Sequence, residues 1–256
     1  MQAAINRWKE IAVMAKRCML LSKRNPDTLL TSIMLPALMM VLFVSLFGRL
    51  IEIDGTSYAN YIVPGVVLQC IGQCACVTAV MVNNDLSSGI VSRFCTLPMK
   101  RSSILNGHVA EAFLRSLVTT AVVLFAALLL GVRPYTDAAC LGMFFLLLCG
   151  SIAAFSYAAV VIGIAANSAE GASALSALVV ILPYISSGFV PVDTLPPVMR
   201  VFAKYQPMTP IVDAIRSAFF EKTLELDVCG GALAWCAGLS VLFFGVSAVM
   251  FRKKVS

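Results

Sequence analysis

Six long stretches of this 256-residue sequence contain no Asp, Glu, Lys, Arg or His. A helix needs about 20 mainly apolar residues to cross the hydrocarbon core of a bilayer. Five of the stretches exceed that length, and the third is shorter at 17 residues. The stretches are 28–48, 55–84, 116–132, 138–169, 171–192 and 228–251. They predict an all-α integral membrane protein with six transmembrane helices.

The helices are expected within one membrane domain covering residues 1–256. The spans are predicted at about 28–48, 61–83, 105–131, 138–165, 171–190 and 229–251. Only 12% of the residues are charged, about half of the fraction that is usual in a soluble domain. The composition therefore excludes an ordinary soluble protein.

The distribution of Lys and Arg predicts the orientation in the membrane. Six spans place both termini on one side, and that side holds 12 basic residues: six in 1–27, three in 84–104 and three in 252–254. The loops on the other side hold six, offset by eight acids. Because cytoplasmic loops are enriched in Lys and Arg, both termini are expected in the cytoplasm, in the cell membrane. The net charge of +6 is thus expected to face membrane lipids, and no nucleic acid partner is expected.

Residues 1–27 precede the first span and predict an amphipathic helix. Ile5, Trp8, Ala12, Ala15 and Met19 recur at helical spacing, and most of the basic residues fall on the other side of the helix. This pattern is typical of a helix lying in the membrane interface, with Trp8 as an anchor. The alternative, an amphipathic helix packed against the protein itself, stays open.

Several polar or helix-breaking residues lie inside the predicted spans. Such residues usually face other helices or a cavity, so interhelical hydrogen bonding and a substrate path are both open interpretations. The fifth span is interrupted, because proline removes a backbone donor and a Ser-Ser-Gly sequence follows. Candidate substrate-path residues are Gln69, Gln73, Tyr157, Pro183, Ser186, Ser187 and Gly188.

The segment 191–227 after the fifth span is divided by five prolines. Its apolar residues predict two amphipathic half-helices that lie on, or dip into, the outer leaflet. An ordered external cap without a role in transport is the alternative. The two sets of apolar residues at helical spacing are Val198, Val201, Phe202, Tyr205 and Ile211, Ile215, Phe219.

No sequence motif for catalysis, nucleotide binding or metal binding is present. The chain lacks the G-x-x-x-x-G-K-[ST] phosphate loop, and its nine cysteines are expected to act mainly as small apolar residues. Glu111 and Arg115 have the spacing and order of a helical ion pair. With His108 they predict a structural polar stripe, and a proton relay is the alternative.

The polar stretch 87–103 connects the second and third spans on the predicted cytoplasmic side. Gly89 permits a turn and Pro98 ends a short helix. Between them an apolar face forms, with Arg93 projecting from another side. A solvated tether has no need of such a face, so this stretch predicts a docking helix. The residues of the face are Ile90, Val91, Phe94 and Leu97.

This stretch resembles the cytoplasmic loop of ABC-2 type transporter permeases. The pattern D-x-x-x-G-x-x-x-R-F-x-x-x-P-x-x-R begins at residue 85, and the segments 58–69, 186–210 and 214–220 also resemble the family, in the same order. Many members have Glu at the position of Asp85. The sequence Ile-Val-Ser after Gly89 is similar to the daunorubicin-resistance branch of antibiotic exporters. The pattern comprises Asp85, Gly89, Arg93, Phe94, Pro98 and Arg101.

The resemblance implies the permease subunit of an ATP-driven ABC exporter for a lipophilic drug, antibiotic or lipid-like compound. The permease is expected to pair with a second copy or a homologous permease, and with cytoplasmic ABC ATPase subunits that bind ATP and Mg. No cofactor and no enzymatic activity are expected on this chain. An exporter of polysaccharide or glycolipid, and a non-transporting scaffold or channel, stay open.

The same resemblance assigns the pattern residues to a coupling surface for the ATPase. Phe94 is expected to insert into the ATPase, and Arg93 and Arg101 to make polar contacts with it. Gly89 and Pro98 are expected to shape the connection, called here the coupling helix (89–98).

Overall fold

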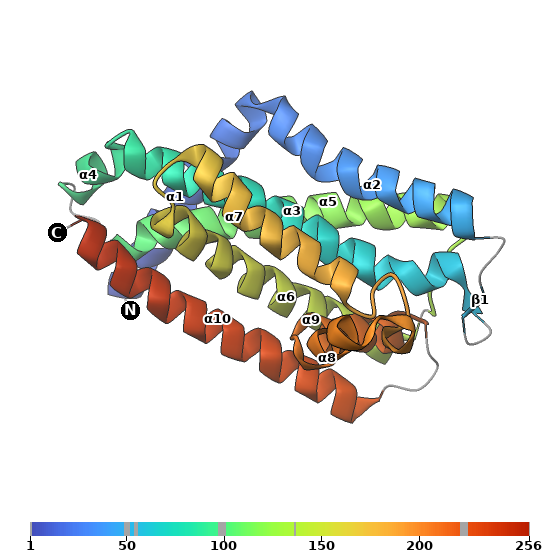
Figure 1. The fold of residues 1–256 in the computed structure, drawn as a ribbon. Helices are drawn as coiled ribbons and strands as arrows, with labels where there is room; N and C mark the ends of the chain where they lie inside the picture. Colours follow the sequence, from blue (N-terminus) through green and yellow to red (C-terminus); the bar gives the residue numbers. More distant parts are fainter. Residues whose placement is uncertain are drawn as a thin grey trace.

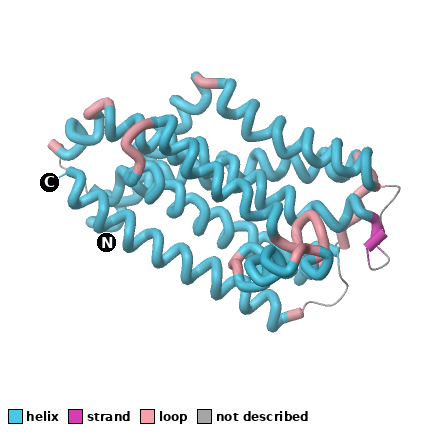
Figure 2. The backbone as a smooth tube through the Cα atoms, viewed as in Figure 1, coloured by secondary structure: helices cyan, strands magenta, loops and turns pink. Residues whose placement is uncertain are grey.

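The computed structural model describes residues 2–48, 52–53, 56–96, 101–135, 137–220 and 225–255. This part of the chain is helical apart from turns, loops and a hairpin of two two-residue strands, β1 (Glu52–Ile53) and β2 (Thr56–Ser57). Figure 2 shows that the loops lie mainly at the ends of long helices. The predicted all-α class is confirmed. The helices are α1 (Gln2–Arg24), α2 (Pro26–Phe47), α3 (Tyr58–Ser87), α4 (Ile90–Cys95), α5 (Arg101–Leu129), α6 (Ala138–Ala165), α7 (Ala169–Ile181), α8 (Pro197–Tyr205), α9 (Met208–Phe220) and α10 (Leu226–Val255), with 3-10 turns η1 (Leu182–Ile185) and η2 (Val192–Thr194).

Within the described part of the chain, five helices are long and apolar enough to cross a membrane, namely α2, α3, α5, α6 and α10. They coincide with five of the six predicted spans. In the remaining one, the predicted fifth span at 171–190, α7 and η1 together form an apolar segment of 17 residues, Ala169–Ile185. Pro183 lies in η1 and has no backbone N–H to continue the α-helical hydrogen bonds, which explains why α7 is short.

The long helices run side by side and give the protein two distinct ends (Figure 1). One end, called the terminal end, holds both termini and α4. The other end, called the hairpin end, holds β1 together with α8 and α9. This arrangement places the stretch that resembles the coupling loop beside the termini, as the sequence predicts.

Helix α3 lies at the centre of the bundle. It contacts α2, α5, α6 and α7, and its most apolar stretch is mostly buried. In contrast, α2 and α10 expose most of their apolar residues. A helix that is apolar all round is buried in protein or faces lipid. The exposed sides of α2 and α10 therefore have the character of lipid-facing surfaces.

Glycines allow close backbone contact where α3 meets its neighbours. A Cβ on Gly65 would lie 2.6 Å from the carbonyl oxygen of Gly188, and a Cβ on Gly163 would lie 2.5 Å from that of Ala79. Small residues at such crossings let helices approach closely inside a membrane. These contacts fix the chain after η1, and the end of α6, against α3.

Helix α1 crosses the long helices near the terminal end and packs against α5 (Figure 1). Its buried side chains include Met14, Ala15 and Cys18. A Cβ on Gly107 of α5 would lie only 2.4 Å from the Cβ of Met14, so the missing side chain allows this close packing.

The predicted apolar stripe of α1 is divided by this packing. Ala15 is buried in the protein, whereas Trp8, Ala12 and Met19 are exposed. The side chain of Ile5 lies outside the described residues. Helix α1 thus docks on the protein through one side and presents exposed apolar residues on another. Lys9, Lys16 and Lys23 are exposed beside these apolar residues, so the predicted separation of apolar from basic residues is wrong for the three lysines. The position of α1 in the membrane interface stays a prediction.

The segment after η1 forms two helices, α8 and α9, at the residues predicted for the half-helices, whose position relative to the membrane stays a prediction. The apolar residues of α9, including Ile211, Ile215 and Phe219, are buried in the protein. Those of α8 are exposed, and Val198 and Tyr205 are the most exposed. Helix α9 is therefore part of the packed bundle, and α8 covers the hairpin end.

Candidate functional site

The residues of the family pattern lie at the turn between α3 and α5, at the terminal end. Asp85 is in the last turn of α3, and Arg93 and Phe94 are on α4. Pro98 lies outside the described residues. Arg101 is the first residue of α5, and its side chain is also outside them. Of the six predicted residues, the structure thus describes four in full, and it brings these four together at this turn: Asp85, Gly89, Arg93 and Phe94.

Gly89 forms the sharp turn from α3 into α4. Its φ is +72°, in the left-handed region, and no atom lies within 4 Å of the Cβ that another residue would add. The conformation alone therefore requires glycine, since an L-residue there costs roughly 1 kcal/mol or more.

Helix α4 packs through one side only. Val91 is 3% exposed and belongs to an apolar cluster with Ile104, Val160 and Phe251. Phe94 is half-buried against the same cluster, whereas Arg93 is exposed. Helix α4 therefore presents Arg93 outward from a fixed position on the protein.

Arg17 of α1 connects the end of α3 with α4. Its Nη1 and Nη2 donate to the two carboxylate oxygens of Asp85 at 2.6 and 2.9 Å. Its Cζ lies 5.2 Å from the centre of the Phe94 ring, within the range of a cation–π contact. The hydrogen bond to Asp85 raises the pKa of the Arg17 guanidinium above its usual value. Sequence reasoning counted Arg17 only as a cytoplasmic charge, because no local motif links it to a residue 68 positions away.

His108 completes the environment of Asp85. Its Nε2 lies 3.2 Å from Asp85 Oδ2, and its Nδ1 lies 3.5 Å from the sulfur of Cys18 on α1. The imidazole is buried, with 2% exposure. Asp85 is consequently shared by residues of α1 and α5, and these contacts hold three helices together beside α4.

The predicted Glu111–Arg115 ion pair is confirmed, with 3.1 Å between Oε1 and Nη1. Both side chains are buried. Arg115 also donates to the Cys74 carbonyl at 3.1 Å and to the Thr78 hydroxyl at 2.5 Å, both on α3. Since a buried charge must be paired and hydrogen-bonded, these contacts explain how Arg115 is accommodated. The pair therefore links α3 with α5, at a position on α3 that is further from the terminal end than Asp85.

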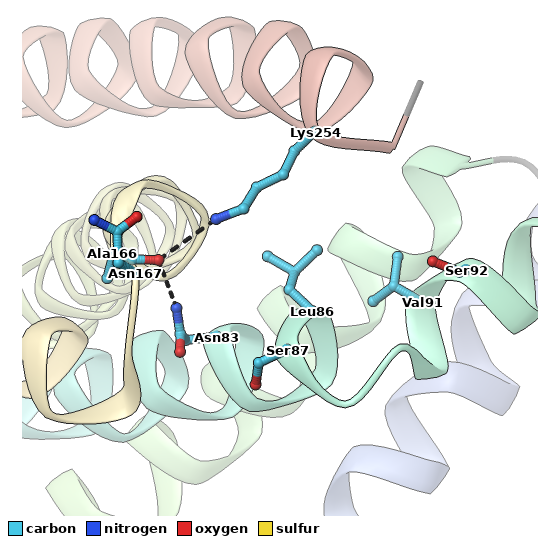
Figure 3. Close-up of a pocket in the computed structure, with 8 residues that line it drawn as sticks. All are labelled: Asn83, Leu86, Ser87, Val91, Ser92, Ala166, Asn167 and Lys254. Carbon is cyan, nitrogen blue, oxygen red and sulfur yellow. Dashed lines mark hydrogen bonds between the residues drawn. The ribbon is translucent and has the colours of Figure 1, made fainter.

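A cavity of about 310 Å³ lies next to α4, between the ends of α3, α6 and α10 (Figure 3). Beside it, Asn83 Nδ2 donates to the carbonyls of Gly163 and Ala166 at 3.1 and 2.8 Å. Lys254 Nζ donates to Ile164 at 2.5 Å and to Ala166 at 3.4 Å. These donors satisfy the last carbonyls of α6, which have no partners inside the helix. Leu86, Ser87, Val91, Ser92 and Asn167 form the rest of its lining.

The predicted substrate-path residues are only partly brought together. Gln69 is buried, and its Nε2 donates to the Tyr184 hydroxyl in η1. Gln73, further along α3 toward the terminal end, is half-buried. Tyr157 lies apart from them on α6, where its hydroxyl is 3.4 Å from Asn106 Oδ1 of α5. The remaining members, Pro183, Ser186, Ser187 and Gly188, lie together in and after η1.

The turn after η1 is closed by its own hydrogen bonds. The Ser186 hydroxyl donates to the Pro183 carbonyl at 2.6 Å and accepts from the Gly188 N–H at 3.1 Å. The Ser187 hydroxyl donates to Asp213 Oδ1 of α9 at 2.6 Å. The helix break is thus buried in protein, which is the condition under which non-helical backbone is tolerated at membrane depth.

Arg216 of α9 ties this turn to the start of α3. It pairs with Asp213 at 2.8 Å and donates to the Ser187 carbonyl at 2.6 Å. Its Cζ lies 4.1 Å from the centre of the Tyr61 ring. From the sequence, Arg216 was only one of the charges in the loops opposite the termini. In the structure it stabilises the turn at 186–188 through its contacts with the Ser187 carbonyl and Asp213.

A second, fully apolar cavity of about 140 Å³ lies between α6, α7, α9 and α10. Its walls include Phe155, Val179, Met208, Ile211 and Phe243. Apolar walls of this kind bind ligands by burial of apolar surface.

Among the described residues, no group of three or more His, Cys, Asp or Glu side chains could hold a metal ion.

Comparison with known proteins gives consistent matches over most of the chain. The family described as "ABC-2 type transporter" matches residues 9–220. The daunorubicin resistance ABC transporter permease protein DrrB1 of Streptomyces coeruleorubidus is 29% identical over 243 residues, which cover 93% of this chain and 84% of the relative. The probable doxorubicin resistance ABC transporter permease protein DrrC of Mycobacterium tuberculosis is 27% identical over 241 residues, which cover 90% of this chain and 83% of the relative.

Proposed function

The chain belongs to the ABC-2 type transporter family, and we propose that it is the permease subunit of an ATP-driven exporter of a lipophilic drug, antibiotic or lipid-like compound. Its homologues are drug-resistance permeases, and among its described residues five helices are long and apolar enough to cross a membrane. The apolar cavity between α6, α7, α9 and α10 supports a lipophilic substrate, because it is lined by apolar side chains.

ATP and Mg would be bound by a separate cytoplasmic ABC ATPase subunit. The chain has no phosphate loop, so it lacks the glycine-rich backbone and lysine that hold nucleotide phosphates. Transport by this subunit then requires a contact that passes on the motion of the ATPase. A second permease copy, or a homologous permease, would form the other half of the substrate path.

The contact with the ATPase would be made by α4. The observation that carries this proposal is the fixed position of α4: Gly89 sets its direction, Val91 anchors it, and Arg17 joins Phe94 to Asp85. A helix held in this way moves with α1, α3 and α5 as a unit. A push on Arg93 and Phe94 would therefore reach the long helices without being lost in a flexible loop.

The terminal end would face the cytoplasm. This orientation is supported by the 12 basic residues predicted on that side and by the placement of α4 beside the termini (Figure 1). With this orientation α7 and η1 would make the fifth of six crossings, since α7 begins near the terminal end and η1 leads to α8 and α9. The buried turn 186–188 would complete the crossing.

Substrate would pass along α3 and η1, toward the hairpin end. Gln69 and Tyr184 join these two elements, and Arg216 joins α9 to the turn that follows. Separation of η1 from α3 would expose these polar groups together with the apolar cavity. Tyr157 is half-buried nearer the terminal end and would contact substrate at an earlier stage of the path.

A reconstitution experiment with a charge reversal tests the coupling proposal. The permease is co-expressed and purified with a candidate ABC ATPase subunit from the same organism, and ATP hydrolysis is measured in vesicles. We expect Arg93→Glu to lower both co-purification and permease-stimulated hydrolysis several-fold. Arg133→Glu is the matched control, because Arg133 is also an exposed arginine and lies just beyond the far end of α5. Unchanged co-purification of the Arg93 variant would remove α4 as the docking helix.

A further inference from the structure

Helix α1 carries a line of three lysines on the side that faces away from the protein. Lys9, Lys16 and Lys23 are seven residues apart, so they lie nearly above one another along the helix. All three side chains are exposed. They are called the lysine stripe.

The direction of the lysine stripe is fixed by the opposite side of α1. Met14 and Cys18 are buried against α5, and Arg17 is held by Asp85. Glu10 is the single acid in α1, and its Oε2 accepts a hydrogen bond from Ser103 of α5 at 2.7 Å. This hydrogen bond directs the acid toward α5, whereas the lysines of the stripe face away from the protein.

Apolar side chains flank the lysine stripe. Trp8 is 72% exposed and Val13 is 65% exposed, and Met19 and Leu20 are also exposed. Helix α1 is joined to the spanning helix α2 by Asn25 alone, which keeps α1 at the edge of the membrane. Exposed apolar and basic residues on one side of an interfacial helix match the boundary between acyl chains and headgroups.

We propose that the lysine stripe is a binding surface for anionic phospholipid headgroups of the leaflet at the terminal end. The proposal rests on the proposed function only in taking that leaflet as the cytoplasmic one. Lysines near an anionic leaflet contribute favourably to membrane binding, and Trp and other apolar residues insert beside them. An acidic surface of the ATPase is the competing partner, but it would leave Trp8 and Val13 without apolar surroundings.

Fluorescence quenching of Trp8 in the full-length permease tests the proposal. Trp235→Phe removes the other tryptophan, so that Trp8 is the single reporter. The protein is placed in vesicles of phosphatidylcholine mixed with phosphatidylglycerol, and one lipid at a time carries brominated chains. We expect brominated phosphatidylglycerol to quench Trp8 more strongly than brominated phosphatidylcholine at low salt. About 1 M salt should abolish the difference, since the Debye length falls to about 3 Å.

The variant with Lys9→Gln, Lys16→Gln and Lys23→Gln should lose the preference, by about fivefold in relative affinity for each lysine. The matched control combines Arg133→Gln with Lys204→Gln, which removes exposed charges near the hairpin end and should keep it. Equal quenching by both lipids in the protein with unchanged lysines would overturn the proposal. A preserved preference in the triple variant, with loss of the ATPase subunit, would assign the stripe to the ATPase instead. Because this readout needs no ATP, its failure is distinct from failure of the proposed function.

Discussion

Replacing Arg17 by Gln should release α4 and the adjoining part of α1 from the end of α3. The guanidinium makes two charge-assisted hydrogen bonds to Asp85, and such bonds contribute about 1.5–3 kcal/mol each. Arg17 is 24% exposed and His108 remains beside the carboxylate, so solvent and the remaining partner compensate for part of the loss. The expected net loss is about 2 kcal/mol, which corresponds to about a 30-fold change in the local opening equilibrium.

Hydrogen–deuterium exchange of the membrane-embedded permease measures this opening. Exchange that follows local opening reports its free energy residue by residue. We expect amides in α4 and in the second half of α1 to exchange about 30-fold faster in Arg17→Gln, and those of α9 to be unchanged. Lys16→Gln, a change at an adjacent exposed residue of the same helix, should leave the exchange rates of α4 unchanged.

A double-mutant cycle separates the Arg17–Asp85 contact from other effects of the substitution. Asp85→Asn should weaken protection of α4 as well, and the two changes together should cost less than their sum, because each removes the same contact. Exchange in α4 that stays within about threefold of the unaltered protein would refute the reasoning, since α4 would then be held by its apolar contacts alone.

Two further substitutions test other parts of the fold. Glu111→Gln should lower the free energy of unfolding by about 3–5 kcal/mol, because it leaves the buried Arg115 charge without its acid. Replacing both Glu111 and Arg115 by Leu should be less destabilising than this single change. A thermal-shift series in which the double variant has the lowest melting temperature would contradict this. Gly188→Ala should also lower the melting temperature, since its Cβ would lie 2.8 Å from Gly65 Cα. Gly230→Ala is the control and should be neutral or stabilising, because no atom lies within 4 Å of the added Cβ. Equal melting temperatures for the two variants would show that the contact at Gly188 can relax.

The positions of the long helices were predictable because a bilayer requires long charge-free stretches. The predicted fourth span, 138–165, coincides with α6, and the spans for α2, α3, α5 and α10 differ from the helices by at most a few residues at each end. The interruption at Pro183 was predictable from its missing backbone donor, and the structure shows it as η1.

The partners of the polar residues were not predictable in the same way. Helical spacing shows which residues share a side of one helix, but not which helix that side meets. For this reason the contacts of Arg17 with Asp85, and of Gln69 with Tyr184, appear only in the structure. Glu111 and Arg115 were an exception, because both lie on one helix at a spacing that pairs them directly.

The side of α1 that packs on the protein was also hidden in the sequence. The predicted apolar side of α1 included Trp8 as a membrane anchor, yet the helix docks on the protein through Met14, Ala15 and Cys18. The close approach of Met14 to Gly107 determines which side of α1 packs on the protein, and it is possible because Gly107, in another helix, has no side chain. A hydrophobic pattern alone therefore gave the helix but not its orientation.

The proposal that α4 transmits the motion of an ATPase is tested most directly by photo-crosslinking in intact cells. A photoreactive residue is placed at Ser92 on α4, and for comparison at Val198 on α8 at the opposite end. Both side chains are exposed, so both positions can report a neighbouring protein. We expect the ATPase subunit to be crosslinked from position 92 and not from position 198. Crosslinking from position 198, or its absence from position 92 when the ATPase is present, would contradict the account.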